Sequence, residues 1–172
     1  MFNQVAVFES AKALAGEEDW GTPDELDAAF EQTCEDVRAG LPLMWRDKWW
    51  RMYDRDPIDQ WVVGRIALTG DSAHPPLQYL AQGAQMAIED GVVLAEKVAA
   101  AGGDYHRAFL AYQRERMNRT ARVVLSSRFF GEYIHVDGGA RELRNELARA
   151  RDPDHPWEVD WLYRGIEVND KL

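Results

Sequence analysis

One carboxylate, Asp71, and the start of a helix expected near Gly83 are the parts of this sequence best suited to chemistry. Residues 61–68 read as a strand, Gly70 and Asp71 follow it, and a turn with two prolines then leads into a long apolar helix. This order places a carboxylate beside a helix N-terminus at the carboxyl end of a strand. The carboxylate can accept a hydrogen bond from a sugar hydroxyl, and the helix end can stabilise negative charge.

A longer pattern surrounds Asp71. A Gly-Asp pair alone identifies little, because strand-to-turn junctions often carry both residues, and in that reading Asp71 caps amides of its own turn. The full pattern is GR at 64–65, three residues, TGDSAHPP at 69–76, six residues, Gly83, six residues and Asp90. It resembles the second FAD-binding motif of the flavin-dependent aromatic hydroxylases. The run PPLQYLAQGA is most similar to 3-hydroxybenzoate 6-hydroxylases, with salicylate hydroxylases next.

The resemblance extends from Val5 to about Ile134 and implies a function. Members of that family bind FAD, use NADH or NADPH as co-substrate, and insert one oxygen atom of O2 into a phenolic ring. The resemblance therefore implies an oxidoreductase that hydroxylates a small phenolic acid. The matched segment corresponds to the carboxyl-terminal part of the family.

The resemblance also assigns roles to particular residues. Asp71 matches the aspartate that accepts a hydrogen bond from the FAD ribityl chain or the sugar next to it, and the following helix start should face the flavin's pyrimidine edge. Gln78 is the expected substrate contact. The expected cofactor contacts are Gly70, Asp71, Pro76, Gln82, Gly83 and Ala84. No catalytic residue and no metal ligand is assigned.

Other residues of the motif are expected to have structural roles. His74 is expected to form a structural hydrogen bond rather than to transfer a proton. Asp90 is expected to order nearby loops or to pair with an arginine. Arg65 is one candidate partner for Asp90 or Asp71, and a surface position is its alternative. Leu80 stands where many members have glycine, so the resemblance does not define the path of the backbone beside the flavin ring.

A first, phosphate-binding motif does not occur in the sequence. The Gly-x-Gly-x-x-Gly turn of such a motif places the FAD pyrophosphate on a helix N-terminus, and no glycines here have that spacing after a strand. The chain is therefore expected to act with a missing N-terminal FAD-binding half. Alone, it is expected to bind FAD poorly and to be inactive.

Composition argues against several other functions. The chain has 30 acidic and 20 basic residues and a net charge of −10, so nucleic-acid binding is not expected. No stretch approaches the roughly 20 apolar residues that a membrane span needs, and the first residues do not read as a signal peptide. The single cysteine, Cys34, is expected inside a helix and has no intrachain disulfide partner, which favours a reducing, cytoplasmic location. The four histidines lack metal-ligand spacing.

The elements expected to position the motif are mostly helices. Thr22 as N-cap and Pro23 as first helical residue predict a helix that ends near residue 40. Apolar periodicity predicts helices at 81–101, 105–130 (capped by Asp104) and 140–150. Strands are predicted at 4–8, 49–53 and 61–68. The fold class is therefore α+β, mainly helical: a partial FAD/NAD(P)-binding domain with short strands from an incomplete sheet and two long C-terminal helices.

The periodicity also predicts which faces are buried. The helix at 81–101 is expected to be largely buried, with one face formed by Ala84, Ala87, Ile88, Gly91, Ala95 and Val98 and broadened by Met86, Val93 and Leu94. The next helix is expected to bury Phe109, Tyr112, Met117, Ala121, Val124 and Leu125. Its arginine face is expected to be solvated or packed on a partner helix: Arg107, Arg114, Arg116, Arg119 and Arg122. Trp157 and Trp161 are expected to pin the tail to the surface.

Three parts follow from these elements. Residues 1–60 are expected to be a remnant of a substrate-domain sheet and helix, 61–101 the strand-turn-helix of the motif, and 102–172 a C-terminal helical region.

Two other functions stay open. A non-enzymatic helical module would self-associate through exposed apolar surface, with the strand at 4–8 as an open edge. A small-molecule binder would use the tryptophans at 45, 49, 50 and 61. A homo-oligomer is also expected for the flavoprotein.

Overall fold

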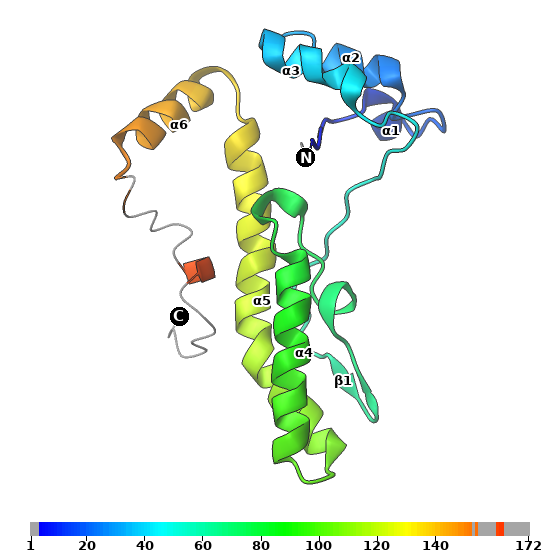
Figure 1. Ribbon diagram of the computed structural model, residues 1–172, viewed down its shortest axis with the longest axis vertical. Coiled ribbons are helices and arrows are strands. Elements are labelled where there is room, and N and C mark those ends of the chain that lie inside the picture. The colour runs from blue at the N-terminus through cyan, green and yellow to red at the C-terminus, as the bar shows by residue number, and fades with distance from the viewer. Residues whose placement is uncertain (1–3, 153, 155–160, 164–172) are drawn as a thin grey trace. The chain divides into compact units, whose positions relative to one another are not determined.

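The computed structural model describes residues 4–152, 154 and 161–163 (Figure 1). The chain forms two compact units, Met1–Arg51 and Met52–Leu172. In the described residues the elements are mostly helices, with one two-stranded sheet. The prediction of a mainly helical α+β fold is therefore confirmed.

The first unit contains three short helices and a 3-10 turn: α1 (Ala11–Ala15), α2 (Pro23–Phe30), α3 (Glu35–Gly40) and η1 (Leu41–Leu43). Thr22 caps α2 by accepting a hydrogen bond from the Glu25 amide, and Pro23 opens the helix, as predicted. The single helix expected up to residue 40 is wrong, because a turn separates α2 from α3. Cys34 consequently stands at the N-cap of α3 and not inside a helix.

Two predicted strands, 4–8 and 49–53, are irregular segments in the structure. A strand needs a neighbouring strand to pair its backbone groups, and in the described residues the one sheet contains only β1 (Val62–Val63) and β2 (Ile66–Ala67), so neither segment has a partner. Apolar composition alone was therefore an insufficient signal here.

The second unit begins with a small hairpin. Strands β1 (Val62–Val63) and β2 (Ile66–Ala67) pair antiparallel, with Val62 opposite Ala67. The prediction of one continuous strand over 61–68 is wrong, because Gly64 adopts a left-handed φ of 58° and turns the chain back. The 3-10 turns η2 (Gly70–Ser72) and η3 (Gln78–Leu80) follow.

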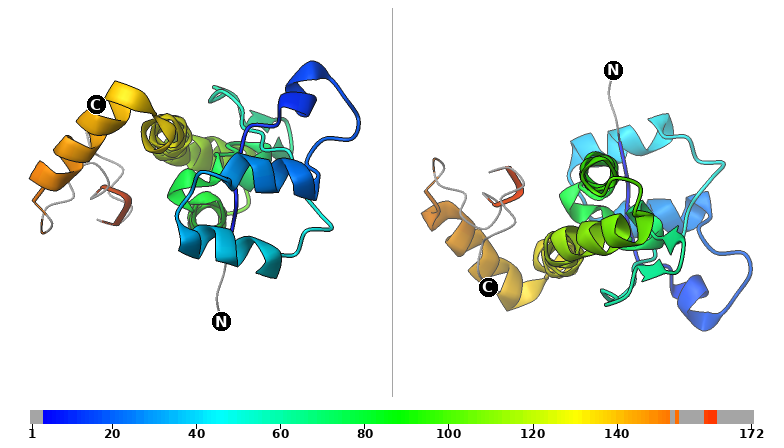
Figure 2. Two further views of the ribbon diagram at one scale, coloured as in Figure 1. Left: turned by 90° about the horizontal axis from the view of Figure 1, so that it is seen from above. Right: turned by 90° about the horizontal axis from the view of Figure 1, so that it is seen from below.

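Two long helices form the body of the second unit. Helices α4 (Gly83–Ala100) and α5 (Tyr105–His135) lie side by side in all views (Figure 1; Figure 2). Asp104 caps α5 by accepting from the Arg107 amide at 3.0 Å, as predicted. Helix α5 continues past residue 130, and α6 (Gly138–Ala150) begins two residues before the predicted start at 140.

Buried apolar side chains gather in two clusters of the second unit. The first contains Trp61, Val62, Ala73, Val93 and Tyr112. The second contains Met86, Val123 and Leu162, with Trp161 packed against it. Trp161 therefore holds part of the tail as predicted, whereas Trp157 lies outside the described residues. On α5, Leu125 is 51% exposed and does not belong to the buried stripe.

Helix α4 buries Met86 and Val93, which were expected to broaden the buried face, but not the centre of that face. Met86, Asp90 and Val93 are buried, whereas Ala84, Ala87, Gly91 and Ala95 are exposed. Ile88 on that outer face is 65% exposed and Val92 is 51% exposed. The prediction that this helix is largely buried is wrong for the described chain, because α5 and η2 cover only part of its surface and leave Ile88 and Val92 exposed.

Candidate functional site

The turn that carries Asp71 is tightly built. Gly70 has a left-handed φ of 55°, and a Cβ placed there would lie 3.3 Å from the Ala87 Cβ on α4. The Ser72 hydroxyl accepts from the Thr69 amide at 3.1 Å and donates to the Thr69 carbonyl at 2.6 Å. Glycine is therefore suited to position 70 both by its conformation and by the close approach to α4.

Asp71, Pro76 and the start of α4 lie together. A Cβ built on Gly83 would be 3.6 Å from the Pro76 Cγ and 4.0 Å from an Asp71 carboxylate oxygen. The Asp71 side chain is exposed, and its carboxylate forms no hydrogen bond or ion pair with the described residues. The turn and the helix start thus lie close together, with an acidic side chain beside the first residue of α4.

The N-terminus of α4 offers backbone amides beside that side chain. The first hydrogen bond of the helix joins the Met86 amide to the Gln82 carbonyl at 2.9 Å. The amides of Gly83, Ala84 and Gln85 therefore have no partner inside the helix, and the N-cap residue Gln82 supplies no side-chain cap. Free amides and the helix dipole together favour a negatively charged or electron-rich group here.

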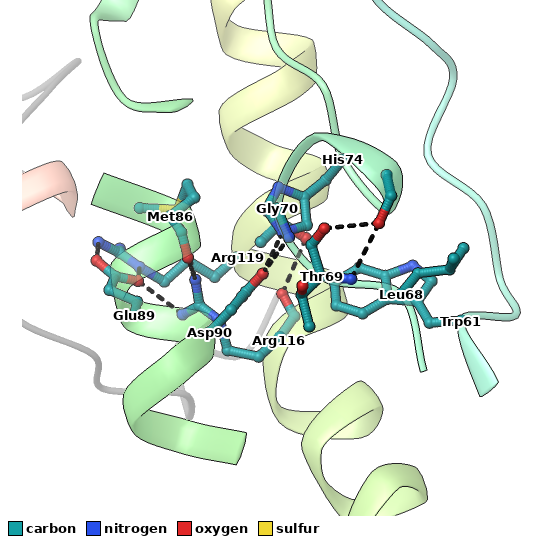
Figure 3. Close-up of polar contacts among 12 residues, drawn as sticks. Trp61, Leu68, Thr69, Gly70, His74, Met86, Glu89, Asp90, Arg116 and Arg119 are labelled. Atoms are coloured by element: carbon teal, nitrogen blue, oxygen red, sulfur yellow. Dashed lines mark hydrogen bonds and ion pairs between the residues drawn. The ribbon is translucent and has the colours of Figure 1, made fainter. Parts of the chain in front are cut away.

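Beneath this turn lies the Asp90 cluster, formed by Gly70, His74, Asp90 and Arg116 (Figure 3). One Asp90 oxygen accepts from the Gly70 amide at 2.9 Å and lies 2.7 Å from His74 Nε2. The other accepts from Arg116 Nε at 2.7 Å. Burial opposes the charge of Asp90, but the hydrogen bonds from His74, Gly70 and Arg116 outweigh it and keep the pKa of this carboxyl below its ordinary value.

Arg116 completes the cluster from α5. Its guanidinium donates to Glu89 at 2.6 Å and to the Met86 carbonyl at 3.2 Å, and the side chain is fully buried. Arg119 also donates to Glu89 at 2.8 Å. Burial disfavours the charge of Glu89, but the bonds from Arg119 and Arg116 lower the pKa of this carboxyl overall.

These contacts decide several predictions. Asp90 pairs with an arginine and orders the turn, as expected, but its partner is Arg116 and not Arg65, which is exposed. His74 forms a buried hydrogen bond, as expected for a structural role. Of the arginines on α5, Arg116 and Arg119 pack on a partner helix, whereas Arg114 is exposed.

Arg116 was not singled out as the partner of Asp90, although the sequence held a signal. It falls at a four-residue spacing between Tyr112 and Thr120, both of which are buried on α5. An arginine inside an apolar stripe indicates a buried partner, because a guanidinium is almost never fully buried unless it is paired.

Tyr112 joins the cluster to the hairpin. Its hydroxyl donates to the Leu68 carbonyl at 3.2 Å, and its ring packs near Trp61 with centroids 5.7 Å apart. Burial, and then the nearby Asp90 carboxylate, raise the pKa of Tyr112 far above its ordinary value. This residue is therefore neutral and structural.

The remaining candidate residues are placed as follows. Gln78 is exposed on η3, between the proline turn and α4. Gln82 is the N-cap residue of α4 and Ala84 is its second residue. The structure thus brings Asp71, Pro76 and Gly83 close together and places Gln78 on the loop that connects them.

Trp61 is buried in the second unit, whereas Trp45 and Trp50 are exposed in the first unit. Within the described residues, no cluster of His, Cys, Asp or Glu has the size to hold a metal ion. A search of the described helices also finds none long and apolar enough to cross a membrane.

Comparison with known proteins defines the class. Residues 2–127 match the model of the FAD binding domain family, and the chain belongs to that family. It is a partial FAD-binding domain, as the sequence predicted.

Among curated relatives, the chain is 43% identical over 169 residues to a 3-hydroxybenzoate 6-hydroxylase of Polaromonas naphthalenivorans, covering 94% of this chain and 41% of the relative. It is 38% identical over 175 residues to a 3-hydroxybenzoate 6-hydroxylase of Klebsiella oxytoca, covering 98% of this chain and 43% of the relative. A 3-amino-4-hydroxybenzoate 2-monooxygenase of Streptomyces cremeus is 37% identical over 143 residues, which cover 83% of this chain and 36% of the relative. The chain therefore spans less than half the length of these relatives.

The residues present fit an FAD group. Asp71 offers an unpaired carboxylate for a ribityl or sugar hydroxyl, and a Cβ on Gly83 would lie 4.0 Å from it. The free amides of α4 suit the electron-rich edge of a flavin. When bound, FAD supplies the redox chemistry that no side chain of this site provides.

Proposed function

We propose that this chain is the flavin-facing and substrate-contacting part of an FAD-dependent monooxygenase that hydroxylates a small phenolic acid with NADH or NADPH and O2. The observation that carries the proposal is the position of Pro76 and the Asp71 carboxylate within about 4 Å of a Cβ built on Gly83, the first residue of α4, whose N-terminal amides have no partner inside the helix. The family match supports it, as does the similarity to relatives that are 3-hydroxybenzoate 6-hydroxylases. A 3-hydroxybenzoate-like acid is the best candidate substrate, followed by a salicylate-like one.

Each residue has a distinct role in this proposal. Asp71 accepts a hydrogen bond from the ribityl chain or the neighbouring sugar, which Gly70 and Pro76 allow to approach. The amides of Gly83 and Ala84, next to Gln82, hold the pyrimidine edge of the ring. Gln78 contacts the aromatic acid. These contacts bind and orient the FAD and the aromatic acid. Proton transfer in this proposal is carried out by other groups.

The proposal also includes a partner. The sequence contains no Gly-rich turn for the FAD pyrophosphate, so the activity requires a further FAD-binding part supplied by another segment or chain. Alone, the chain is expected to bind FAD weakly and to be inactive. A cytoplasmic location and a homo-oligomeric state belong to the same proposal.

The test measures FAD uptake. The purified 172-residue chain is mixed with FAD, with and without the N-terminal part of the Polaromonas naphthalenivorans relative as a separate chain. Flavin fluorescence and visible absorbance report binding, and consumption of NADH or NADPH with 3-hydroxybenzoate reports turnover. We expect uptake and turnover only with both chains present. Absence of flavin binding in the mixture would contradict the proposal.

The variants Asp71→Asn and Asp71→Ala test whether the Asp71 carboxylate contacts FAD in the mixture of the two chains. Loss of a hydrogen bond to a charged group costs about 1.5–3 kcal/mol, so FAD should bind roughly ten- to a hundredfold more weakly. Asp59→Asn removes an exposed carboxylate away from the turn and serves as the matched control. Equal FAD affinity in the Asp71 and Asp59 variants would remove Asp71 from the site.

One observation favours a second candidate function, a non-enzymatic module that self-associates. The outer face of α4 exposes Ile88 and Val92 next to several small residues, which is an apolar surface of the kind that mediates association. Light scattering of the chain alone tests this candidate. A concentration-dependent dimer that Ile88→Asp abolishes would support it, and a clean monomer would exclude it.

A further inference from the structure

The loop that carries Gln78, residues 77–81, is held mainly by the far half of α5. The Ser127 hydroxyl donates to the Leu77 carbonyl. The Tyr79 ring lies against Gly131, and it meets the His135 ring edge-on with centroids 5.3 Å apart. These contacts join residues about fifty positions apart in the sequence, and Figure 1 shows this loop beside α5.

Gly131 makes the contact with Tyr79 possible. A Cβ at position 131 would collide with the Tyr79 ring. Gly131 lies four residues before the end of α5 at His135. Glycine inside a helix costs about 1 kcal/mol relative to alanine, and the close contact with the Tyr79 ring gives a packing reason for its presence. His135 donates from Nδ1 to the Gly131 carbonyl at 2.7 Å, which fixes the imidazole that faces Tyr79.

The loop backbone depends on this support. Ala81 adopts a left-handed φ of 52°, the one such non-glycine residue in the described chain. Its amide donates to the Gln78 carbonyl at 2.8 Å and closes a tight turn. A non-glycine residue in this region is strained and persists only when its surroundings hold it. Here the holding residues are on α5.

We propose that Tyr79 is a positioning residue for the aromatic acid. The Tyr79 ring packs against Gly131, and the Ser127 hydroxyl bonds to the Leu77 carbonyl. Together these contacts hold the loop in one conformation, which fixes the position of the exposed Gln78 side-chain amide. This inference rests on the proposed function, because the role of Gln78 as substrate contact belongs to it. It adds that α5, far from the FAD motif in sequence, determines how the acid is held.

The first experiment needs no flavin. Amide hydrogen exchange is measured in the 172-residue chain for Ser127→Ala and Gly131→Ala. Exchange at residues 79–81 should rise about tenfold or more, while α4 amides stay within about twofold, because only local opening changes. Ser126→Ala, at the adjacent half-buried serine, and Gly139→Ala, at a helical glycine with open space around it, are matched controls. Unchanged loop exchange in Ser127→Ala would overturn the proposal, even if Gly131→Ala does not fold.

The second experiment measures ligand affinities in the flavin-loaded mixture of the two chains. Tyr79→Leu removes the ring, and Tyr79→Phe keeps it as the conservative control. The affinity for 3-hydroxybenzoate, read from the flavin difference spectrum, should fall about tenfold in Tyr79→Leu and be retained in Tyr79→Phe. The affinity for FAD should stay within about twofold in both, since its contacts are made by other residues.

The outcomes distinguish a failure of the positioning role of Tyr79 from a failure of the proposed function. Equal losses of FAD and acid affinity in Tyr79→Leu indicate a general structural role and overturn the positioning role. Unchanged acid affinity with normal FAD uptake refutes the inference alone. Failure of the wild-type mixture to bind FAD refutes the proposed function, and the substrate role of Tyr79 falls with it.

Discussion

Both faces of α4 carry apolar side chains, but only the inner face also buries charged ones. Its inner face buries the carboxylate of Asp90 and part of that of Glu89 against Arg116 (Figure 3). Its outer face exposes Ile88, Val92 and several small residues. The helix therefore packs within this chain through paired charges as well as through Met86 and Val93, and it leaves Ile88 and Val92 exposed.

Paired charges and apolar spacing on α4 give different information about burial. Burying a charge is tolerated when it is paired and fully hydrogen-bonded, and every strong contact of Asp90 comes from within the same unit. Apolar spacing, in contrast, marks a face suited to burial without saying what covers it. On α4 nothing in the described chain covers the outer face.

The largest effect is expected from Arg116→Met, which breaks the inner face. The change leaves Asp90 buried without its cation, and removing one partner of a buried pair costs about 3–5 kcal/mol. Urea unfolding followed by helical circular dichroism measures the free energy of unfolding. Arg114→Met, at an exposed position of the same helix, should change it by less than about 0.5 kcal/mol. Similar losses in both variants would contradict the importance of the inner face.

Met86→Ala tests the apolar part of the inner face. The side chain is fully buried in the second core cluster, and its truncation should cost about 2–5 kcal/mol of unfolding free energy. The same urea titration measures it. A loss below about 1 kcal/mol would mean that the cluster collapses around the change or is weakly packed.

A smaller effect is expected from acid. The pKa values of Asp90 and Glu89 are lowered in the folded chain, so the unfolded chain binds more protons near pH 4 and stability rises with pH there. This contribution is complete above the ordinary carboxyl pKa and is lost as the pH falls through the lowered values. Glu89→Gln removes one of the two groups, so its free energy of unfolding should fall less on acidification from about pH 5 to 3. An equal fall of the free energy of unfolding with pH in the wild-type chain and in Glu89→Gln would show that Glu89 does not contribute to the acid sensitivity.

The smallest effect is expected on the outer face. Ile88→Ala should change the free energy of unfolding of the monomer by less than about 0.5 kcal/mol, because the side chain is 65% exposed. Urea unfolding at low protein concentration is the measurement. A loss that grows with protein concentration would show that this face is covered by a second copy.

Local signals in the sequence predicted much of the framework. The caps at Thr22 and Asp104 bond to the amides three residues later, as their side chains dictate, and the apolar runs become α4 and α5. The meeting of Asp71 with the start of α4 also follows from the order of turn and helix. These features depend on residues that are close in the sequence.

The failures involve contacts between distant residues. Arg116 bonds to Asp90, 26 positions away, and Ser127 bonds to the Leu77 carbonyl, 50 positions away. No local sequence pattern predicts either contact. The strand predicted at 4–8 failed because the sequence does not reveal whether a pairing strand is present. The buried face of α4 was predicted only in part, because apolar spacing identifies surface suited to burial, whereas packing partners decide which part of it is buried.

The anchoring of Asp90 by Gly70, His74 and Arg116 has a consequence for cooperativity. Separating α4 from α5 necessarily frees the turn that bears Asp71, since the same carboxylate joins all three. Heat or denaturant should therefore melt the helix pair and disorder this turn in a single transition, and a ligand held at the turn would raise the melting temperature of both helices.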